Sequence, residues 1–335
     1  MRLEPGSKAT HGAPLPIPIL TLSAPQDDAQ RALDEHGDSS ARTSPMLDLW
    51  QNNLHPDVRD TGTALAHAGL PLHKYAQALN SSQCFAMNLF LPFIAGNAAP
   101  LASFLSERLG RTVDVQGIDL EYYGSGDILC EIAGHQPTGD EKLTAADVVI
   151  HVTDKSGQQG LVVVEVKLSE LGFTHCGGIN SRGNRDRAAC DSRELMFRSP
   201  ERCYLNRPYR AQRDRRYWTI FAQSHGDLAT AFPGAMTPGC PFATEWQQPM
   251  RNHALCLGHL HADRATFWML ALVHHDDNPD VAGPWDAYRD ATIDKQHIQR
   301  WPASSLIGCI AQALPVSSPP IHTWLQQRYF LEDSP

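Results

Sequence analysis

The run Leu161-Val-Val-Val-Glu165-Val-Lys167-Leu168 is the segment of this sequence that decides its fold. Valine favours β-strands, and successive side chains along a strand point to opposite faces. Glu165 and Lys167 therefore point to one side, while Val164 and Val166 point to the other. The pattern predicts a buried strand that presents an acid and a base on one face at its end.

A second acid begins the preceding apolar run. Asp147 lies eighteen residues before Glu165, and the turn-rich segment Asp154-Lys-Ser-Gly157 separates the two runs. A hairpin of this length brings the start of one strand to the end of the next. Two carboxylates can hold Mg²⁺, and a lysine two residues beyond one of them can orient a water or stabilise charge growing on a phosphate. This layout is typical of a metal-dependent nuclease site.

A bare Glu-x-Lys is weak evidence, since about one is expected by chance in a chain of this length. The alternative interpretation is an exposed strand end with a cross-strand ion pair. The valine-rich strand before Glu165, together with Asp147 at the start of the preceding strand, favours the catalytic interpretation.

Composition indicates a soluble globular protein, with 335 residues of which 42% are apolar. The net charge of -9 disfavours indiscriminate coating of nucleic acid. One window is basic, because eleven arginines face five acids between Arg182 and Arg216. No run approaches the roughly 20 apolar residues of a bilayer crossing, and no secretory signal is recognisable, so we expect no membrane contact and a cytoplasmic location.

Residues 1–45 carry six prolines without a sustained period, which predicts a flexible leader before a single domain over 46–335. Helices are expected at about 64–79 and 100–109. Strands are expected at 113–123, 127–133, 147–153 and 161–168, as an antiparallel meander. Later elements are a short strand at 217–222, a helix at 250–260, a strand at 266–274, and helices at 304–314 and 322–331.

Four segments give the sequence a family resemblance: Ser81-Ser-Gln-Cys-Phe-Ala-Met-Asn88, Ala146-Asp147-Val-Val, Val164-Glu-Val-Lys167 and Gln247-Gln-Pro-Met-Arg-Asn252. Over about residues 60 to 330 the chain resembles the PD-(D/E)XK nuclease superfamily, and more narrowly a family of bacterial restriction endonucleases. The resemblance implies an α/β (α+β) restriction-endonuclease-like core, with a mixed central sheet of about four to six strands flanked by helices. It also implies a helical, Cys/Arg-rich insertion over 171–245 and a helical C-terminus.

The same resemblance implies a Mg²⁺-dependent or Mn²⁺-dependent deoxyribonuclease. Asp147, Glu165 and the backbone carbonyl of Val166 would be metal ligands, and Lys167 the catalytic lysine. Ala146 stands where the superfamily usually has proline.

Further residues are candidates for supporting this site. Many members of the superfamily add an upstream glutamate, for which Glu121 and Glu107 are the alternatives; either is otherwise a solvated charge. Gln247 and Arg251 are four apart, so on a helix they would share a face, as in recombination-type nucleases in which such a glutamine supports the metal site. A structural cap or a core-supporting arginine is the alternative.

Four cysteines downstream of the lysine lie in polar, Gly- and Arg-rich surroundings: Cys176, Cys190, Cys203 and Cys240. Four such thiols can hold Zn²⁺ or a [4Fe-4S] cluster. Their intervals of 13, 12 and 36 residues lack the paired spacing of zinc ribbons. Similarity to iron–sulfur members of the superfamily adds the cluster as an interpretation, beside zinc and unligated thiols.

The segment from Tyr204 to Trp218 interleaves arginines with aromatic residues, a mixture suited to phosphate contact and base stacking. Arg213, Arg215 and Arg216 are the candidates for DNA contact. The alternative is a solvated, partly ion-paired helix with its last two aromatic residues facing the core.

We therefore expect a DNA endonuclease of restriction or defence type, with DNA as partner. Two alternatives stay open: a catalytically silent DNA-binding or assembly protein that keeps the nuclease fold, and a recombination-type exonuclease with a cysteine-held cluster. A homodimer is also open.

Overall fold

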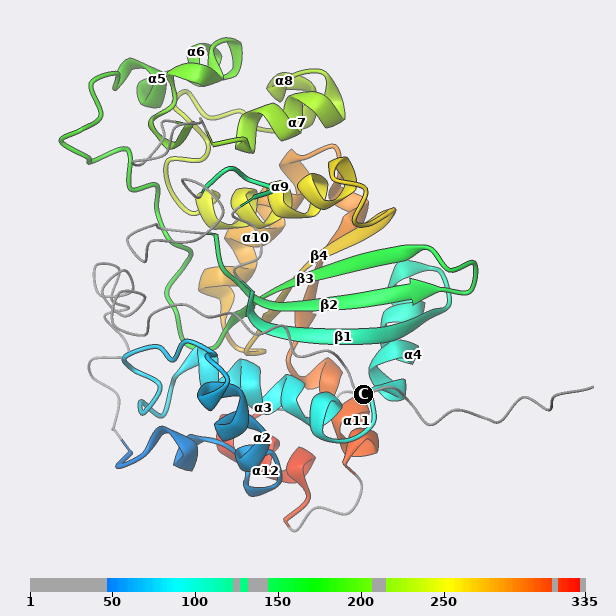
Figure 1. Ribbon diagram of the computed structural model, residues 1–335. Coiled ribbons are helices and arrows are strands. Elements are labelled where there is room, and N and C mark those ends of the chain that lie inside the picture. Colours follow the sequence, from blue (N-terminus) through cyan, green and yellow to red (C-terminus); the bar gives the residue numbers. More distant parts are fainter. Residues whose placement is uncertain (1–46, 123–126, 132–143, 207–214, 315–318, 332–335) are drawn as a thin grey trace, which may run out of the picture.

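The computed structural model describes residues 47–122, 127–131, 144–206, 215–314 and 319–331, so the expected leader lies outside the described residues. A five-stranded sheet in the order β1-β2-β3-β4-β5 forms the centre of the protein (Figure 1). The strands are β1 (Val113–Tyr122), β2 (Ala146–Asp154), β3 (Gln159–Lys167), β4 (Phe267–His274) and β5 (Ile298–Pro302). The first three form an antiparallel meander, and β4 and β5 continue the sheet in parallel. The expected mixed sheet is confirmed.

The turn between β2 and β3 fixes the register of this central hairpin. Asp154 accepts a hydrogen bond through Oδ1 from the backbone N–H of Ser156 at 2.8 Å. Gly157 has a φ of 83°, a left-handed conformation that glycine adopts without strain. At the other end of the hairpin the last Cα pair is Val148 with Val164. The turn thereby aligns the start of β2 with the end of β3.

Helices cover both faces of the sheet (Figure 1). One layer contains α2 (Pro56–His67), α3 (Ser82–Ala95), α4 (Ala99–Leu109), α11 (Ser304–Ala313) and α12 (Ile321–Tyr329). The other contains α7 (Tyr217–His225), α9 (Gln247–His261) and α10 (Pro279–Ala291). The predicted alternation of β3 is confirmed, because Val164 and Val166 enter the first core while Val163 enters the second.

Local sequence signals set several helix ends. Ser81 caps α3, its hydroxyl accepting the N–H of Cys84 at 3.3 Å, so the Ser-Ser-Gln motif starts a helix. Gly110 ends α4 at a φ of 64°. Pro249 lies in the first turn of α9, where a missing backbone N–H costs nothing.

Three expected elements differ from the structure. Residues 127–130, expected in a strand, form a turn. Residues 217–222, also expected in a strand, lie in α7, because burial at 217, 218, 220 and 221 follows a helical period. The helix expected over 64–79 is α2, which ends at His67 before Gly69 and Pro71. Sequence patterns missed α10 and β5.

The Cys/Arg-rich segment between β3 and α9 carries short helices within loops (Figure 1). These are α5 (Ala188–Asp191), α6 (Arg193–Arg198) and α8 (Leu228–Ala231). The 3-10 turns within the described ranges are η2 (Trp50–Asn53), η3 (Pro200–Arg202), η4 (Tyr204–Asn206) and η5 (Lys295–His297). Among the described helices none alone is long and apolar enough to span a membrane; α3 with α4, bent by 112° at their break, meets the length and composition requirement only as a pair.

Candidate functional site

Three carboxylates gather where β1 ends, β2 begins and β3 ends. The Val148–Val164 pair is the last of the β2–β3 ladder, so the next residues, Asp147 and Glu165, face each other across the two strands. Glu121 of β1 lies beside Asp147, between two residues that both pair with β2. The sheet register thus brings three acids from distant parts of the sequence into one row.

Glu165 is completely buried, yet protein donors satisfy both of its oxygens. Its Oε1 accepts from Gln248 Nε2 at 2.5 Å and lies 2.9 Å from Lys167 Nζ. Its Oε2 accepts from Asn252 Nδ2 at 2.8 Å. The two amides of α9 and the ammonium of Lys167 thus hold the Glu165 carboxylate in one orientation.

The side chain of Asp147 bonds to the backbone of β3 just beyond the last residue pair of the β2–β3 hairpin. Its Oδ2 accepts the backbone N–H of Val166 at 2.6 Å, which ties the start of β2 to the residue between Glu165 and Lys167. Burial, followed by the negative charge of Glu165, raises the pKa of Asp147 well above its usual range, while the Lys167 charge opposes this. The positive charge near the Asp147 carboxyl is therefore too small to offset its burial and the charge of Glu165.

Glu121 takes a backbone conformation that is rare for a residue with a side chain, with a φ of 48°. Its Oε1 accepts from Gln83 Nε2 at 2.8 Å, and Gln83 is itself fixed by donating to the carbonyl of Pro71 at 2.8 Å. Burial raises the pKa of Glu121 to about 7, with the charge of Glu165 adding to the effect. Of the two upstream candidates, Glu121 lies at the site, whereas Glu107 is exposed on α4 near the other end of β1.

Lys167 stays an ammonium ion in these surroundings. Burial alone would lower its pKa, but the charges of Glu165, Glu170 and Asp147 outweigh burial and raise it. Its Nζ also lies 5.9 Å from the centre of the Phe173 ring. The group is a fixed positive charge, suited to stabilising an anion rather than to accepting a proton.

The residues of α9 that contact Glu165 each lie one position after the expected pair, Gln247 and Arg251. Gln248 and Asn252, four residues apart, reach Glu165. Gln247 lies one residue earlier, about 100° round the helix. Arg251 instead donates from Nε to Thr144 Oγ1 at 2.9 Å and pairs with the buried Glu131. Arg251 is thus bonded in the core, as the alternative interpretation held.

Gln83, Gln248 and Asn252 are the residues of this site that sequence analysis did not single out. All three belong to segments already quoted for the family resemblance. The spacing of Gln248 and Asn252 on a helix was the available signal, but nothing in the sequence showed which face of α9 turns to the sheet.

Two of the three expected DNA-contact residues, Arg215 and Arg216, lie immediately before α7. Arg213 lies outside the described residues. Arg216 bonds from its backbone N–H to the carbonyl of Leu129 at 2.8 Å, and its half-buried side chain donates to Gln223 Oε1 at 3.2 Å. Arg215 is half-buried beside it. The neighbouring aromatic residues at 217 and 218 are buried and face the core, so they offer no surface for base stacking.

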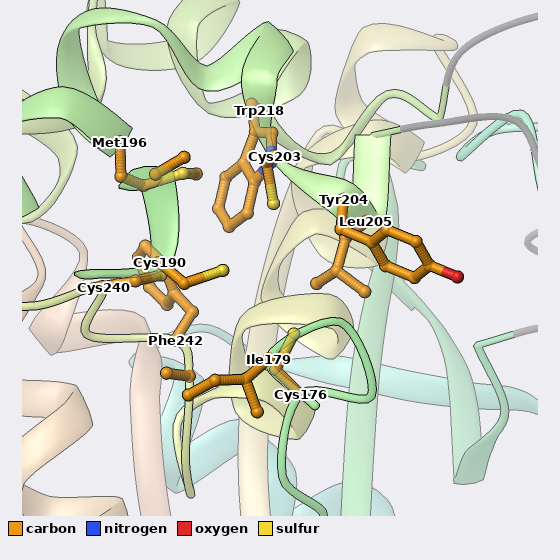
Figure 2. A pocket seen from close by; sticks show the side chains of 12 residues that line it. Cys176, Ile179, Cys190, Met196, Cys203, Tyr204, Leu205, Trp218, Cys240 and Phe242 are labelled. Carbon is orange, nitrogen blue, oxygen red and sulfur yellow. The ribbon is translucent and has the colours of Figure 1, made fainter. Parts of the chain in front are cut away.

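The four cysteines singled out above line one cavity beyond α9 (Figure 2). Within the described part of the chain, no group of three or more His, Cys, Asp or Glu side chains is placed so that it could hold a metal ion. Asp147 and Glu165, with the carbonyl of Val166, therefore remain predicted ligands.

The sequence was compared with protein families, curated proteins and solved structures, and one family matches. No curated protein and no solved structure matches the chain. Residues 24–330 match the family described as "Restriction Endonuclease associating with ARP". The match covers most of the chain, including the three-stranded meander and α9. The chain therefore belongs to this restriction endonuclease family.

Proposed function

We propose that the protein is a divalent-metal-dependent deoxyribonuclease of restriction or defence type, which cleaves phosphodiester bonds within DNA. One observation carries the proposal: Glu121, Asp147, Glu165 and Lys167 converge at one end of the sheet, with Glu165 held by two amides of α9. The family description names an association with ARP, and we extend this association to the present chain.

The donor set suits Mg²⁺ or Mn²⁺. Mg²⁺ prefers oxygen ligands and keeps several waters, so it needs only one or two carboxylates rather than a closed group of side chains. Asp147 and Glu165 would hold it, with the carbonyl of Val166. Burial and the charge of Glu165 push Asp147 towards protonation, and a divalent cation would return it to the charged form. When bound, the ion would polarise the phosphate and lower the pKa of a water.

Side chains of the protein would stabilise the developing charge and hold the carboxylates in position. Lys167 places a permanent positive charge beside Glu165, where it can neutralise charge that develops on a phosphate oxygen. Gln248 and Asn252 prevent Glu165 from turning away, which keeps the carboxylate in position. Glu121, held by Gln83, contributes a third acid that favours the binding of a cation.

The catalytically silent alternative has one observation in its favour, because both oxygens of Glu165 are already bonded to protein donors. A cleavage assay decides between the two. Closed circular and linear DNA are incubated with Mg²⁺ or Mn²⁺ and wild-type protein, Lys167→Ala or Lys155→Ala. Lys155 is an exposed lysine in the β2–β3 turn and serves as the matched control.

We expect cleavage by the wild type and by Lys155→Ala, and a loss of about 10²-fold or more in Lys167→Ala. Cleavage of closed circles identifies an endonuclease, and cleavage of linear DNA alone identifies an exonuclease. Equal rates for Lys167→Ala and wild type would remove the proposed site, and binding without cleavage by the wild type would establish the silent alternative.

A further inference from the structure

Four cysteines from four separate turns of the chain line a single cavity. Cys176 follows β3, Cys190 lies in α5, Cys203 lies between η3 and η4, and Cys240 precedes α9. Apolar side chains, among them Trp218, complete the lining. Figure 2 shows the sulfurs of Cys176, Cys190 and Cys203 projecting into the space between them. All four cysteines are free thiols.

Backbone N–H groups are aimed at three of the sulfurs in the same way. The sulfur of Cys176 accepts from the N–H of Gly178, two residues later, and that of Cys203 accepts from Leu205. In each case the N–H of the following residue donates as well, from Ile179 and Asn206.

The remaining two sulfurs also have donors. Cys240 accepts from the N–H of Phe242, again two residues on. Cys190 accepts from Asn184 Nδ2 at 3.4 Å. A neutral thiol is a weak acceptor, whereas a thiolate is a strong one. Such a repeated arrangement of donors suits sulfur atoms that carry negative charge.

The rest of the lining carries no charge that could balance thiolates, since it consists of uncharged side chains such as Ile179, Met196 and Phe242. Four thiolates in such a cavity would repel one another. A metal centre would supply the positive charge that this set of sulfurs lacks.

The segment is built of short elements. Between β3 and α7 the described residues form no strand, and α5 and α6 have only 4 and 6 residues. Met196 and Leu205 anchor it in the second core, and no disulfide joins the described cysteines. A centre held by four cysteines would add a cross-link between its turns.

Four cysteines are the usual ligand set of a [4Fe-4S] cluster. Tetrahedral zinc with Zn–S bonds of about 2.3 Å would draw four sulfurs to about 3.8 Å from one another, whereas a cluster holds each sulfur on a different iron. Here the four cysteines come from four separate turns and line one cavity, into which three of the sulfurs visibly point. We propose that Cys176, Cys190, Cys203 and Cys240 bind one [4Fe-4S] cluster.

Each thiol loses its proton when its sulfur bonds to one iron, and iron and sulfide are supplied from outside the protein. The binding of the cluster does not depend on the proposed nuclease function.

One consequence does rest on that function. The backbone N–H of Cys176 bonds to the carbonyl of Ala243 at 3.0 Å, and that of Thr174 bonds to Gln248 Oε1 at 3.4 Å. Gln248 in turn holds Glu165. The cluster would therefore keep Gln248 in place, so its loss would slow cleavage as well.

The test is the metal content of protein purified without oxygen and reconstituted with ferrous iron and sulfide. We expect brown protein with visible charge-transfer absorption, about four iron atoms and about four sulfides per chain, and an electron paramagnetic resonance signal after reduction. Cys190→Ser and Cys203→Ser should lose most of the iron. Cys309→Ser and Cys130→Ser, which change cysteines outside the cavity, should keep it.

Colourless wild-type protein without iron overturns the proposal, as does stoichiometric zinc in place of iron, or unchanged iron in both cavity variants. If those variants do not fold, as judged by circular dichroism, the metal content of the wild type and of the two control variants decides. Cleavage is measured separately: iron bound without nuclease activity contradicts only the proposed function.

Discussion

Asn252 donates a hydrogen bond from Nδ2 to Oε2 of Glu165 at 2.8 Å, joining α9 to the end of β3 across 87 residues of sequence. Gln248, one helical turn earlier, donates to the other oxygen of the same carboxylate. Two amides on one helix face thus fix an acid that is buried from solvent. This relationship makes the orientation of α9 part of the candidate site.

Asn252→Ala should destabilise the protein by about 1–3 kcal/mol, because a buried carboxylate oxygen loses its donor. Urea unfolding measures the change. Gln158→Ala, which removes an exposed amide in the β2–β3 turn, should leave stability within about 0.5 kcal/mol of wild type. In a Glu165→Gln background the cost of Asn252→Ala should shrink. An equal cost in both backgrounds would show that the bond is not coupled to Glu165.

Stability without divalent ions should fall as the pH rises through the titration of Glu121. Its pKa is raised to about 7 by burial, from an ordinary 4.5, so the folded protein holds a proton that the unfolded chain releases. Between about pH 5 and about pH 8 the wild type should lose on the order of 1–3 kcal/mol relative to Glu121→Gln.

Unfolding in EDTA at the two pH values is the measurement. Adding Mn²⁺ at the higher pH should restore stability to wild type, because an ion that binds only the folded state stabilises it. Asp147→Asn, which changes a predicted metal ligand, should gain less stability from Mn²⁺ than the wild type does. Parallel pH dependence of wild type and Glu121→Gln would contradict the assignment.

Arg215→Ala combined with Arg216→Ala tests the predicted DNA contact. Each lost phosphate contact should reduce the slope of log affinity against log salt by about 0.9, besides weakening binding. Fluorescence anisotropy in EDTA measures both without cleavage. Arg111→Ala is the control, because Arg111 lies at the far end of β1 beside Asp154. An unchanged slope in the double variant would assign DNA contact to other residues.

Arg251→Met should destabilise the fold by about 1–3 kcal/mol, because it removes the positive charge beside the buried Glu131 while the hydrogen bonds from Thr144 and Tyr217 to that carboxylate remain. Adding Glu131→Gln should recover part of that loss. The affinity for Mn²⁺ of the folded variant, measured by titration calorimetry, should stay near that of wild type. A large loss of Mn²⁺ affinity with little loss of stability would instead restore the metal-supporting role first expected for Arg251.

The relative positions of Asp147, Glu165 and Lys167 could be predicted from the sequence, because they depend on strand periodicity. Alternation placed Glu165 and Lys167 on one face of β3, and the length of the hairpin brought Asp147 opposite Glu165. Both follow from rules that involve only neighbouring strands. The antiparallel meander followed in the same way, whereas the mixed sheet was implied by the family resemblance.

Other features depend on packing between distant segments, which a single sequence does not encode locally. The face of α9 that meets the sheet decides that Gln248, and not Gln247, reaches Glu165. The run at 217–222 has no decisive alternation, and its place against α9 made it a helix. The short β5, with polar residues at its centre, forms a strand because β4 supplies a partner.

The turn at Asp154 and Gly157 has an effect far from its own position. Seven residues of β2, or about 23 Å at about 3.3 Å per residue, separate Asp154 from Asp147. If this turn closed one residue out of step, the side chains of β3 would exchange faces relative to β2, and Asp147 would no longer meet Glu165. A solvent-facing loop with no chemistry of its own thus determines whether the acids assemble, so insertions there should abolish cleavage while the ends of the strands remain unaltered in sequence.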